Sequence, residues 1–394
     1  MLLPRRHPRF FLLLASLIFT ALLLLLPRSP LAAFQSSAST GSPSRPIKSP
    51  VVYQGVSARV RRAERAYQKM LRGRDVLIAK VGPSPRDVAL FPPDKEPWPP
   101  YTVWDFFPPA FSCPHELERI GALGDGGKWV CGLSQLQDKE DCIVYSVGSP
   151  ADASFEAELL ARTRHCQLYV FDHTASSLPR ALSAPASLPT ALGEFYSAWD
   201  VPSLENEHDY WDSRGTGQRT HFKPYRITGQ DAPATADKPK SYTLETIMRQ
   251  NGHTHIDILK IDLEGWEFDA LTTFLLPNSD FTSQKPRAPP VSQMLLELHL
   301  WGRDFSGLLS WWTVLERAGL RAVAREPNLV YQNYNRLQGA ELAEYTFLNV
   351  AAPNIFISED GTSPLSPPWT ALQDPQVPDH ELPSPLAPIH EDEQ

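Results

Sequence analysis

The sequence is poor in cysteine and has no excess of positive charge. It contains four cysteines in 394 residues, and none of them shows the C-x-x-C spacing of a zinc site, so we expect no metal site. Lysine and arginine number 37 against 45 aspartates and glutamates, which gives a formal net charge of -8. A chain with this charge has no large positive field to hold a phosphate backbone, and we therefore expect no nucleic-acid partner.

The four cysteines lie within one stretch of the sequence, at Cys113, Cys131, Cys142 and Cys166. Two disulfides are expected there if the domain folds in an oxidising compartment, and four buried thiols are the alternative. The spacing of the cysteines does not decide between the two.

Proline is abundant, with 39 residues, and it gathers between the candidate secondary-structure elements. Because proline interrupts helices and strands, these stretches indicate long surface connections and unstructured ends. Hydrophobic residues make up 42% of the chain, which is enough to bury a large core and excludes a wholly disordered protein. We expect one compact domain with proline-rich flanks.

The longest hydrophobic run lies close to the N-terminus. Residues 10–26 read FFLLLASLIFTALLLLL, and a helix of this length, rising ~1.5 Å per residue, comes close to the ~30 Å thickness of a bilayer core. Three arginines precede the run and one follows it, which favours a cytoplasmic N-terminus. We expect a type II signal anchor of the Golgi or endoplasmic reticulum; the alternative is a signal peptide cleaved near Ala33, which would give a secreted protein.

The chain divides into segments of different composition. We expect a cytoplasmic tail at 1–9, the transmembrane anchor at 10–26, a flexible stem at 27–50, a basic helix followed by a proline and aromatic strap at 51–109, the catalytic domain at 110–350 and a disordered, proline-rich acidic tail at 351–394. The helix is indicated by apolar residues at helical spacing, and its basic face is either solvated or in contact with anionic lipid or an acidic partner. The strap is expected to pack on the domain surface as extended chain.

Within 110–350, short apolar runs alternate with amphipathic stretches, which is typical of an α/β domain built on a mainly parallel sheet. The expected strands are residues 142–148, 167–172, 221–227, 255–262 and 291–300, followed by a closing antiparallel hairpin of 320–327 and 344–350. The expected helices are residues 153–163, 241–252, 268–276 and 305–320.

In open α/β sheets the ligand lies outside the carboxyl ends of the strands, so the residues that follow each strand are the first candidates for a site. Ser146 and Gly148 end the first strand in a small, flexible loop that lets backbone N–H groups approach a ligand. Asp172 ends the second strand, where a carboxylate can accept hydrogen bonds from both hydroxyls of a ribose. A plain turn and a loop-capping aspartate are the alternatives at these two places.

The fourth strand ends in alternating charges. Lys260, Asp262 and Glu264 fall on one side of a continuing strand, so a cation is expected beside two carboxylates at the ligand edge. A salt-bridged helix start is the alternative. The next strand adds Glu297 and His299, and the unperturbed pKa of histidine, near 6.5, suits a general base.

These residues carry a resemblance. The succession YSVGS, VFDHT, LETIMRQNGHTHIDILKIDLEGWEF and LLELHLW, together with GDGGKWVCG at 124–132, resembles the methyltransferase-like protein 24 type of methyltransferase domain. The segment KIDLEGWE is also similar to the related FkbM-type methyltransferases. The resemblance covers most of residues 110–350, and the loop SVGSP departs from it because it lacks the multi-glycine G-x-G pattern of most methyltransferases.

The resemblance implies a Rossmann-like class I methyltransferase fold and S-adenosylmethionine as cofactor. It implies that Gly148 belongs to the cofactor loop, that Asp172 binds the ribose and that Asp262 faces the transferred methyl group. Ser146, in the loop after the first strand, is expected to bind the cofactor as well. We expect methylation of a hydroxyl on a small-molecule, lipid or glycan acceptor, with Asp262, His299 and Lys260 as catalytic residues. Glu264 and Glu297 are expected to bind the acceptor.

Two other functions fit the same sequence. In a type II glycosyltransferase, Asp262 and Glu264 would bind a divalent cation and a nucleotide sugar as a D-x-D-like pair. A non-catalytic binding module would keep the fold without the cofactor. Binding of S-adenosylhomocysteine, of a nucleotide sugar with manganese, or of neither separates the three.

Overall fold

The computed structural model describes residues 55–93, 96–148, 152–175, 177, 182, 216–233, 239–276, 288–328 and 341–358. The expected anchor at 10–26, the stem at 27–50 and the tail from residue 359 onward lie outside this part of the chain. Within it, no helix has both the length and the apolar character that crossing a membrane requires.

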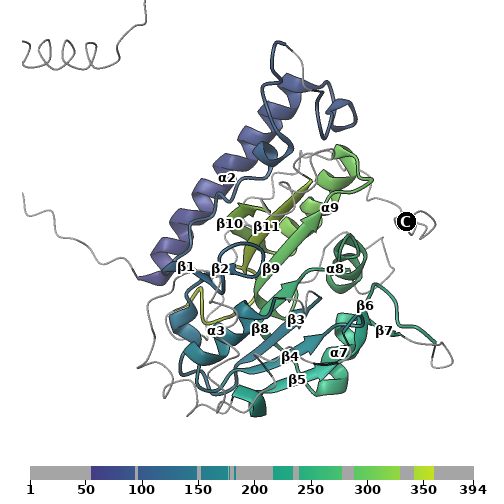
Figure 1. The fold of residues 1–394 in the computed structure, drawn as a ribbon. Helices are drawn as coiled ribbons and strands as arrows, with labels where there is room; N and C mark the ends of the chain where they lie inside the picture. The colour runs from purple at the N-terminus through teal and green to yellow at the C-terminus, as the bar shows by residue number, and fades with distance from the viewer. Residues whose placement is uncertain are drawn as a thin grey trace, which may run out of the picture. The chain divides into compact units, whose positions relative to one another are not determined.

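A seven-stranded sheet forms the centre of the domain (Figure 1). Its order is β10 (Leu320–Pro327), β11 (Leu342–Asn349), β9 (Val291–His299), β8 (Ile256–Ile261), β3 (Ile143–Val147), β4 (Gln167–Phe171) and β5 (Thr220–Lys223). The neighbours from β9 to β5 are parallel, whereas β11 is antiparallel to both β9 and β10. The predicted mainly parallel, Rossmann-like sheet and its closing antiparallel pair are confirmed.

Helices cover both faces of the sheet, with α3 (Ser154–Arg162) on one side and α7 (Leu244–Asn251), α8 (Glu267–Leu275) and α9 (Phe305–Arg317) on the other (Figure 1). Successive residues of a strand point to opposite faces. Accordingly Tyr145 of β3 belongs to one buried hydrophobic cluster and Val144 to the other.

Side-chain caps fix the starts of two of these helices. The Thr243 hydroxyl accepts a hydrogen bond from the N–H of Thr246 at the start of α7, and the carboxylate of Asp304 accepts one from Gly307 at the start of α9. Such caps satisfy N–H groups that have no partner inside the helix.

Helix α2 (Val56–Val81) confirms the helix predicted from the basic segment, and buried ion pairs hold it to the domain. The guanidinium of Arg74 lies 2.6 Å from the carboxylate of Glu316 on α9, which also accepts a hydrogen bond of 2.5 Å from the hydroxyl of Tyr67. Arg321 on β10 pairs with Glu64 at 3.0 Å. One side of this basic helix is therefore an interface with the domain, and part of its positive charge is buried there.

The proline and aromatic strap enters the core, which differs from the expected surface position. It contains a short 3-10 helix, η2 (Val103–Phe106), and Phe106 and Phe107 are fully buried. The ring of Phe107 lies 4.7 Å from that of Trp312 on α9, between ring centroids. The prolines keep this segment out of long helices and strands, but burial of its large aromatic side chains is favourable enough to place it in the core.

The boundaries of the packed domain are wider than expected. Phe356 and Ile357 are fully buried, so packed chain continues beyond residue 350. The expected third strand at 221–227 is divided at Pro224: β5 joins the central sheet, and β6 (Tyr225–Ile227) pairs with β7 (Lys240–Tyr242). Proline has no N–H to donate to a ladder, which explains the break.

The structure adds one pair of strands that the sequence did not predict, and it decides the state of the four cysteines. The strands β1 (Leu117–Ile120) and β2 (Lys128–Cys131) form a separate antiparallel pair that we did not predict. The four cysteines form two disulfides, Cys113–Cys131 and Cys142–Cys166. The thiol alternative therefore does not apply to this structure.

A buried ion pair joins α3 to the two central strands. The ammonium of Lys260 lies 2.8 Å from a carboxylate oxygen of Glu156, and the hydroxyl of Ser146 donates to the same oxygen at 2.7 Å. Lys260 is 1% exposed and Glu156 is 2% exposed. The expected position of Lys260 beside the carboxylates after β8 is wrong, because its side chain is paired inside the domain. The side chain of Ser146 is also occupied there, and its part in cofactor binding stays a prediction.

We expect Lys260→Met to lower the free energy of unfolding by about 3–5 kcal/mol, since it leaves the carboxylate of Glu156 buried without its counter-charge. Removing both charges, in Lys260→Met with Glu156→Leu, should restore most of that loss. Urea unfolding of the three proteins measures both values. A single variant as stable as the parent protein would contradict the structural role of Lys260.

Candidate functional site

The strand ends place four of the expected site residues at one edge of the sheet. Gly148 follows β3, Asp172 follows β4, Asp262 follows β8 and His299 ends β9. These four strands are parallel neighbours, so their carboxyl ends meet at the same edge. In this class of sheet that edge is the place for a ligand.

Position 148 requires glycine because the ends of β3 and β8 lie so close together there that no side chain fits between them. Its φ is +80°, and a Cβ atom at this position would lie 1.7 Å from the backbone oxygen of Asp262. The N–H of Gly148 donates to the carbonyl of Phe171 at 3.0 Å, and the N–H of Asp262 donates to Val147 at 2.9 Å. The backbone of Gly148 therefore links β3, β4 and β8, while residues 149–151 of the same loop lie outside the described residues.

Asp172 is both a loop cap and an available acceptor. Its oxygen Oδ1 accepts hydrogen bonds from the N–H and the hydroxyl of Thr174, both at 2.6 Å, and from the N–H of Ala175 at 3.2 Å. No hydrogen bond to Oδ2 is found from the described residues, although the side chain is only 4% exposed. The capping alternative is thus correct for one oxygen, and the other remains able to accept from a ligand hydroxyl.

The chain turns sharply after β8. The strand ends at Ile261, and Glu264 and Gly265 both have positive φ, +48° and +98°. A left-handed residue other than glycine costs energy and is often found at functional sites. Glu264 is exposed after this turn, and it does not belong to the three-residue group that Asp262 forms with Glu297 and His299.

Glu267, at the start of α8, fixes the histidine of the site. One oxygen of its fully buried carboxylate accepts from the backbone N–H of His299 at 2.7 Å and lies 3.3 Å from the ring nitrogen Nδ1 of His299. The other oxygen accepts from the N–H of Gly265 at 2.8 Å. Glu267 therefore does more than complement the dipole at the start of a helix. The signal for this role in the sequence is an acidic residue beside the apolar residues that begin α8.

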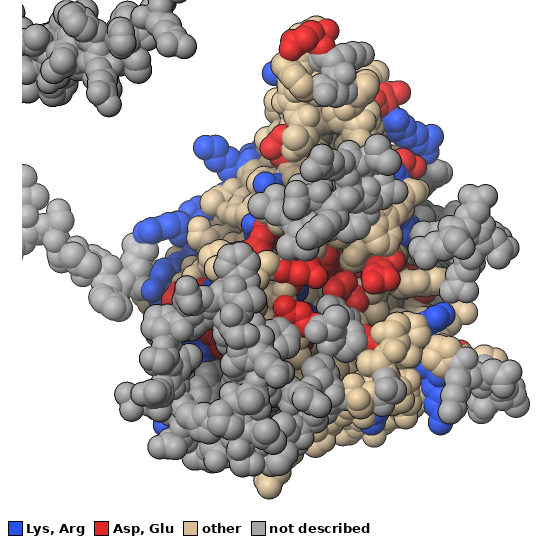
Figure 2. Space-filling view, in the orientation of Figure 1, with Lys and Arg blue, Asp and Glu red and all other residues tan. Residues whose placement is uncertain are grey.

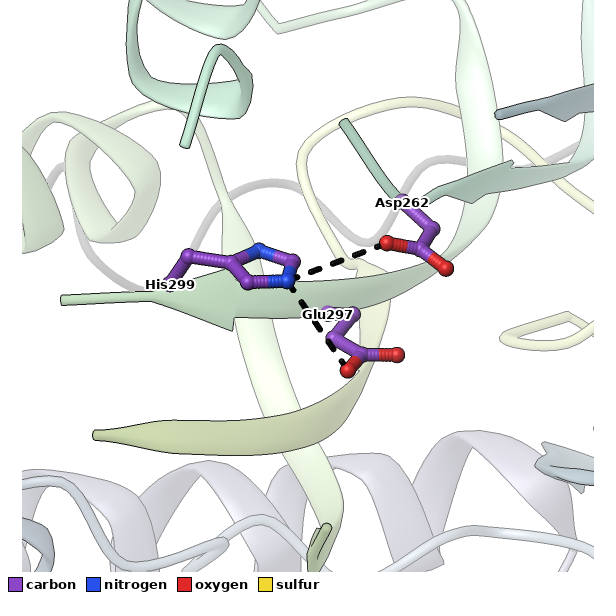
Figure 3. Close-up of side chains that lie close together, drawn as sticks. All are labelled: Asp262, Glu297 and His299. Carbon is purple, nitrogen blue, oxygen red and sulfur yellow. Dashed lines mark ion pairs between the residues drawn. The ribbon is translucent and has the colours of Figure 1, made fainter. Parts of the chain in front are cut away.

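The remaining nitrogen of His299 faces two carboxylates (Figure 3). Nε2 lies 3.9 Å from an oxygen of Asp262 and 4.0 Å from an oxygen of Glu297. Burial lowers the pKa of His299, but the hydrogen bond and charge of Glu267 and the charges of Asp262 and Glu297 outweigh it and raise that pKa to about 9. The imidazole thus carries a proton on both nitrogens at neutral pH, which is unsuited to the general-base role that we expected.

Glu297 is a buried acid beside a second one. It lies directly across from Glu344 in the β9–β11 ladder, and the ammonium of Lys128 is 2.8 Å from Glu344 and 3.7 Å from Glu297. Burial raises the pKa of Glu344 to about 8, and burial with the charge of Asp262 raises that of Glu297 to about 7. The amide of Asn328 donates to Glu297 at 2.8 Å. Lys128, Glu344 and Asn328 were not predicted, although Lys128 lies in the segment GDGGKWVCG.

Acidic side chains dominate this region. Figure 2 shows Asp and Glu gathered near the middle of the face that Figure 1 presents, in the area between the labels β9 and α8. Within the described ranges two groups place their ligand atoms closely enough to hold a metal ion. The first is Asp262, Glu297 and His299, and the second is Asp125, Glu297 and Glu344.

Two family models match the chain. A methyltransferase domain matches residues 92–183, and the methyltransferase FkbM domain matches residues 157–321. The second range contains Asp172, Asp262, Glu267, Glu297 and His299, and the first contains Lys128 and Gly148.

Comparison with solved structures gives weaker likenesses. The fibrillarin pre-rRNA processing protein of Methanococcus jannaschii is 10% identical over 60% of this chain and 71% of its own, with a TM-score of 0.27. The 16S rRNA methyltransferase KamB is 14% identical over 59% of this chain and 100% of its own, with a TM-score of 0.28. No curated protein matches the chain.

We expect Gly148→Ala to lower the free energy of unfolding by about 3 kcal/mol or more, because the added methyl group forces β3 and β8 apart. The matched control is Gly252→Ala, whose φ of +74° is similar but whose Cβ would meet nothing within 4 Å. It should cost about 1 kcal/mol, the strain of a left-handed alanine alone. Equal losses in urea unfolding of the two variants would show that the strand approach is not the constraint.

Proposed function

Because the chain contains an FkbM-related methyltransferase domain, we propose that it is an S-adenosylmethionine-dependent enzyme that methylates a hydroxyl group. The observation that carries the proposal is the meeting of Gly148, Asp172 and Asp262 at the carboxyl edge of four parallel strands. A nucleoside cofactor and an acceptor can both reach this edge.

The residues of the edge suit the cofactor. Asp172 has one carboxylate oxygen held by its own loop and a second that accepts from a ribose hydroxyl. Gly148 keeps the neighbouring backbone free of a side chain. When bound, S-adenosylmethionine supplies a methyl group on a positively charged sulfur, which leaves as a neutral thioether with the electron pair of the broken bond.

The chain's own contribution is to position the acceptor and to take its proton. Asp262 is the carboxylate for this role, since its side chain is 15% exposed and lies at the end of β8. His299, whose Nε2 lies 3.9 Å from an oxygen of Asp262, helps to hold that carboxylate in position. Positioning of this kind supplies most of the rate in a displacement that needs little acid–base chemistry.

The two disulfides support a secretory location, because such bonds persist in oxidising compartments. We propose a type II membrane protein of the Golgi or endoplasmic reticulum lumen, held by residues 10–26. Its acceptors would then be glycans, lipids or small metabolites of that pathway.

Calorimetric titration of the full-length protein with S-adenosylhomocysteine tests the proposed cofactor. We expect binding, and we expect Asp172→Asn to weaken it about 10-fold or more, because a charged acceptor is lost while the asparagine oxygen can still cap the loop. The matched control is Asp138→Asn, an aspartate paired with Arg164 on the surface, which should leave the affinity unchanged.

Other results of this titration would overturn the proposal. Binding of a nucleotide sugar with manganese in place of S-adenosylhomocysteine would make the protein a glycosyltransferase. Binding of neither would make it a non-catalytic module.

The proposed location predicts the state of the cysteines. When cells are lysed in an alkylating reagent, we expect no cysteine to be labelled before reduction and all four after it, measured by mass spectrometry. Labelling of all four cysteines without reduction would place the chain in a reducing compartment.

A further inference from the structure

The group formed by Asp262, Glu297 and His299 has the spacing of ligands around a shared cation. The two distances from Nε2 of His299 to the carboxylate oxygens, 3.9 and 4.0 Å, are too long for hydrogen bonds. An ion midway between Nε2 and either carboxylate oxygen would lie about 2.0 Å from both atoms of that pair, which is close to the bond length that divalent metals make with imidazole nitrogen and carboxylate oxygen. Figure 3 shows the ring nitrogen pointing to the gap between the two carboxylates.

The histidine is also oriented as a metal ligand. Its side chain is 4% exposed, and Nδ1 faces the buried carboxylate of Glu267 while Nε2 has no hydrogen bond among the described residues. Metal-bound histidines commonly use their second nitrogen on a carboxylate, which fixes the tautomer and the direction of the ring. Glu267 and His299 reproduce that arrangement.

The charge of the surroundings favours a cation. Lys128 contacts Glu297 and Glu344, but it lies 2.8 Å from Glu344 and 3.7 Å from Glu297, so it is committed to the former. Glu297 is 4% exposed and faces Asp262 as well. Asp262 and Glu297 face one imidazole, and the one ammonium near them, that of Lys128, is closer to Glu344, so a further positive charge between Asp262 and Glu297 is favourable.

We propose that Asp262, Glu297 and His299 bind a divalent transition-metal cation. Two oxygen ligands and one imidazole suit the series from manganese to zinc better than magnesium or calcium, which prefer oxygen alone. Three protein ligands leave coordination positions open, as in catalytic sites and unlike closed structural ones.

The cation gives the site a role in acceptor binding, and this part rests on the proposed function. A hydroxyl that occupies an open position is oriented at the end of β8 and its pKa is lowered. The second oxygen of Asp262 remains available to take the proton. The metal thus selects acceptors with a hydroxyl, or two adjacent hydroxyls, that can reach the ion.

The test is manganese binding by the full-length protein in detergent after removal of bound metal with a chelator. Electron paramagnetic resonance detects free Mn²⁺, so binding appears as a loss of signal. We expect one tight site per chain and release of Mn²⁺ on addition of Zn²⁺. His299→Gln and the partly exposed Asp262→Asn should each weaken binding about 100-fold, and Glu267→Gln, which only orients the histidine, about 10-fold.

Two controls locate the ion. Glu326→Gln removes a carboxylate that pairs with Arg119 outside both groups of ligands and should leave Mn²⁺ binding unchanged. If Glu344→Gln or Asp125→Asn releases the ion while His299→Gln keeps it, the cation lies in the second group and the proposal is wrong. The melting temperature of each variant shows that it is folded.

The outcome is independent of the cofactor. S-adenosylhomocysteine binding without any Mn²⁺ or Zn²⁺ binding would overturn the metal site and leave the proposed function standing. Metal binding that the three variants weaken, without S-adenosylhomocysteine binding, would support the site and overturn the methyltransferase proposal.

Discussion

The site depends on one buried carboxylate, that of Glu267. Its two oxygens hold the turn after β8 and the end of β9, since one accepts from Gly265 and the other from the backbone of His299. A fully buried carboxylate requires such partners, because an unpaired charge inside a protein is costly. The hydrogen bonds that stabilise Glu267 therefore also set the position of Asp262, which precedes the turn, and the direction of the His299 ring.

The rest of the site has more carboxylates than positively charged side chains at one edge of the sheet. Glu297 and Glu344 are neighbours across strands, where like charges repel, and Lys128 from the β2 strand offsets only part of that repulsion. Burial is the main cause that raises the pKa of both glutamates, and a neighbouring carboxylate adds to it, Asp262 at Glu297 and Glu297 at Glu344. A protonated histidine or a bound cation relieves the repulsion between these carboxylates, and this is the physical link between the proposed function and the proposed metal site.

A second buried ion pair, inside the domain, stabilises the fold and does not belong to the site. Lys260 and Glu156 are also a buried ion pair, but their partners lie on α3, β3 and β8, and they hold helix to sheet. Only Ile261 separates Lys260 from Asp262 in the chain, yet the side chain of Lys260 is paired inside the core and that of Asp262 is available at the edge. Residues of β8 up to Ile261 therefore stabilise the fold, and Asp262, which follows the strand, belongs to the site.

The sequence by itself determined most strands and helices of the central sheet, since hydrophobic period and caps are local properties, and it located Gly148, Asp172, Asp262, Glu297 and His299 at or near strand ends. It missed the pair of β1 and β2 and the break at Pro224. It could not show that Lys260 and Ser146 turn to Glu156, because that partner lies on α3, more than 100 residues before Lys260. Only the tertiary structure decided the roles of Glu267, Lys128 and Glu344 and the pairing of the cysteines. Those contacts join segments distant in the chain, and local patterns carry no information about which distant charges meet.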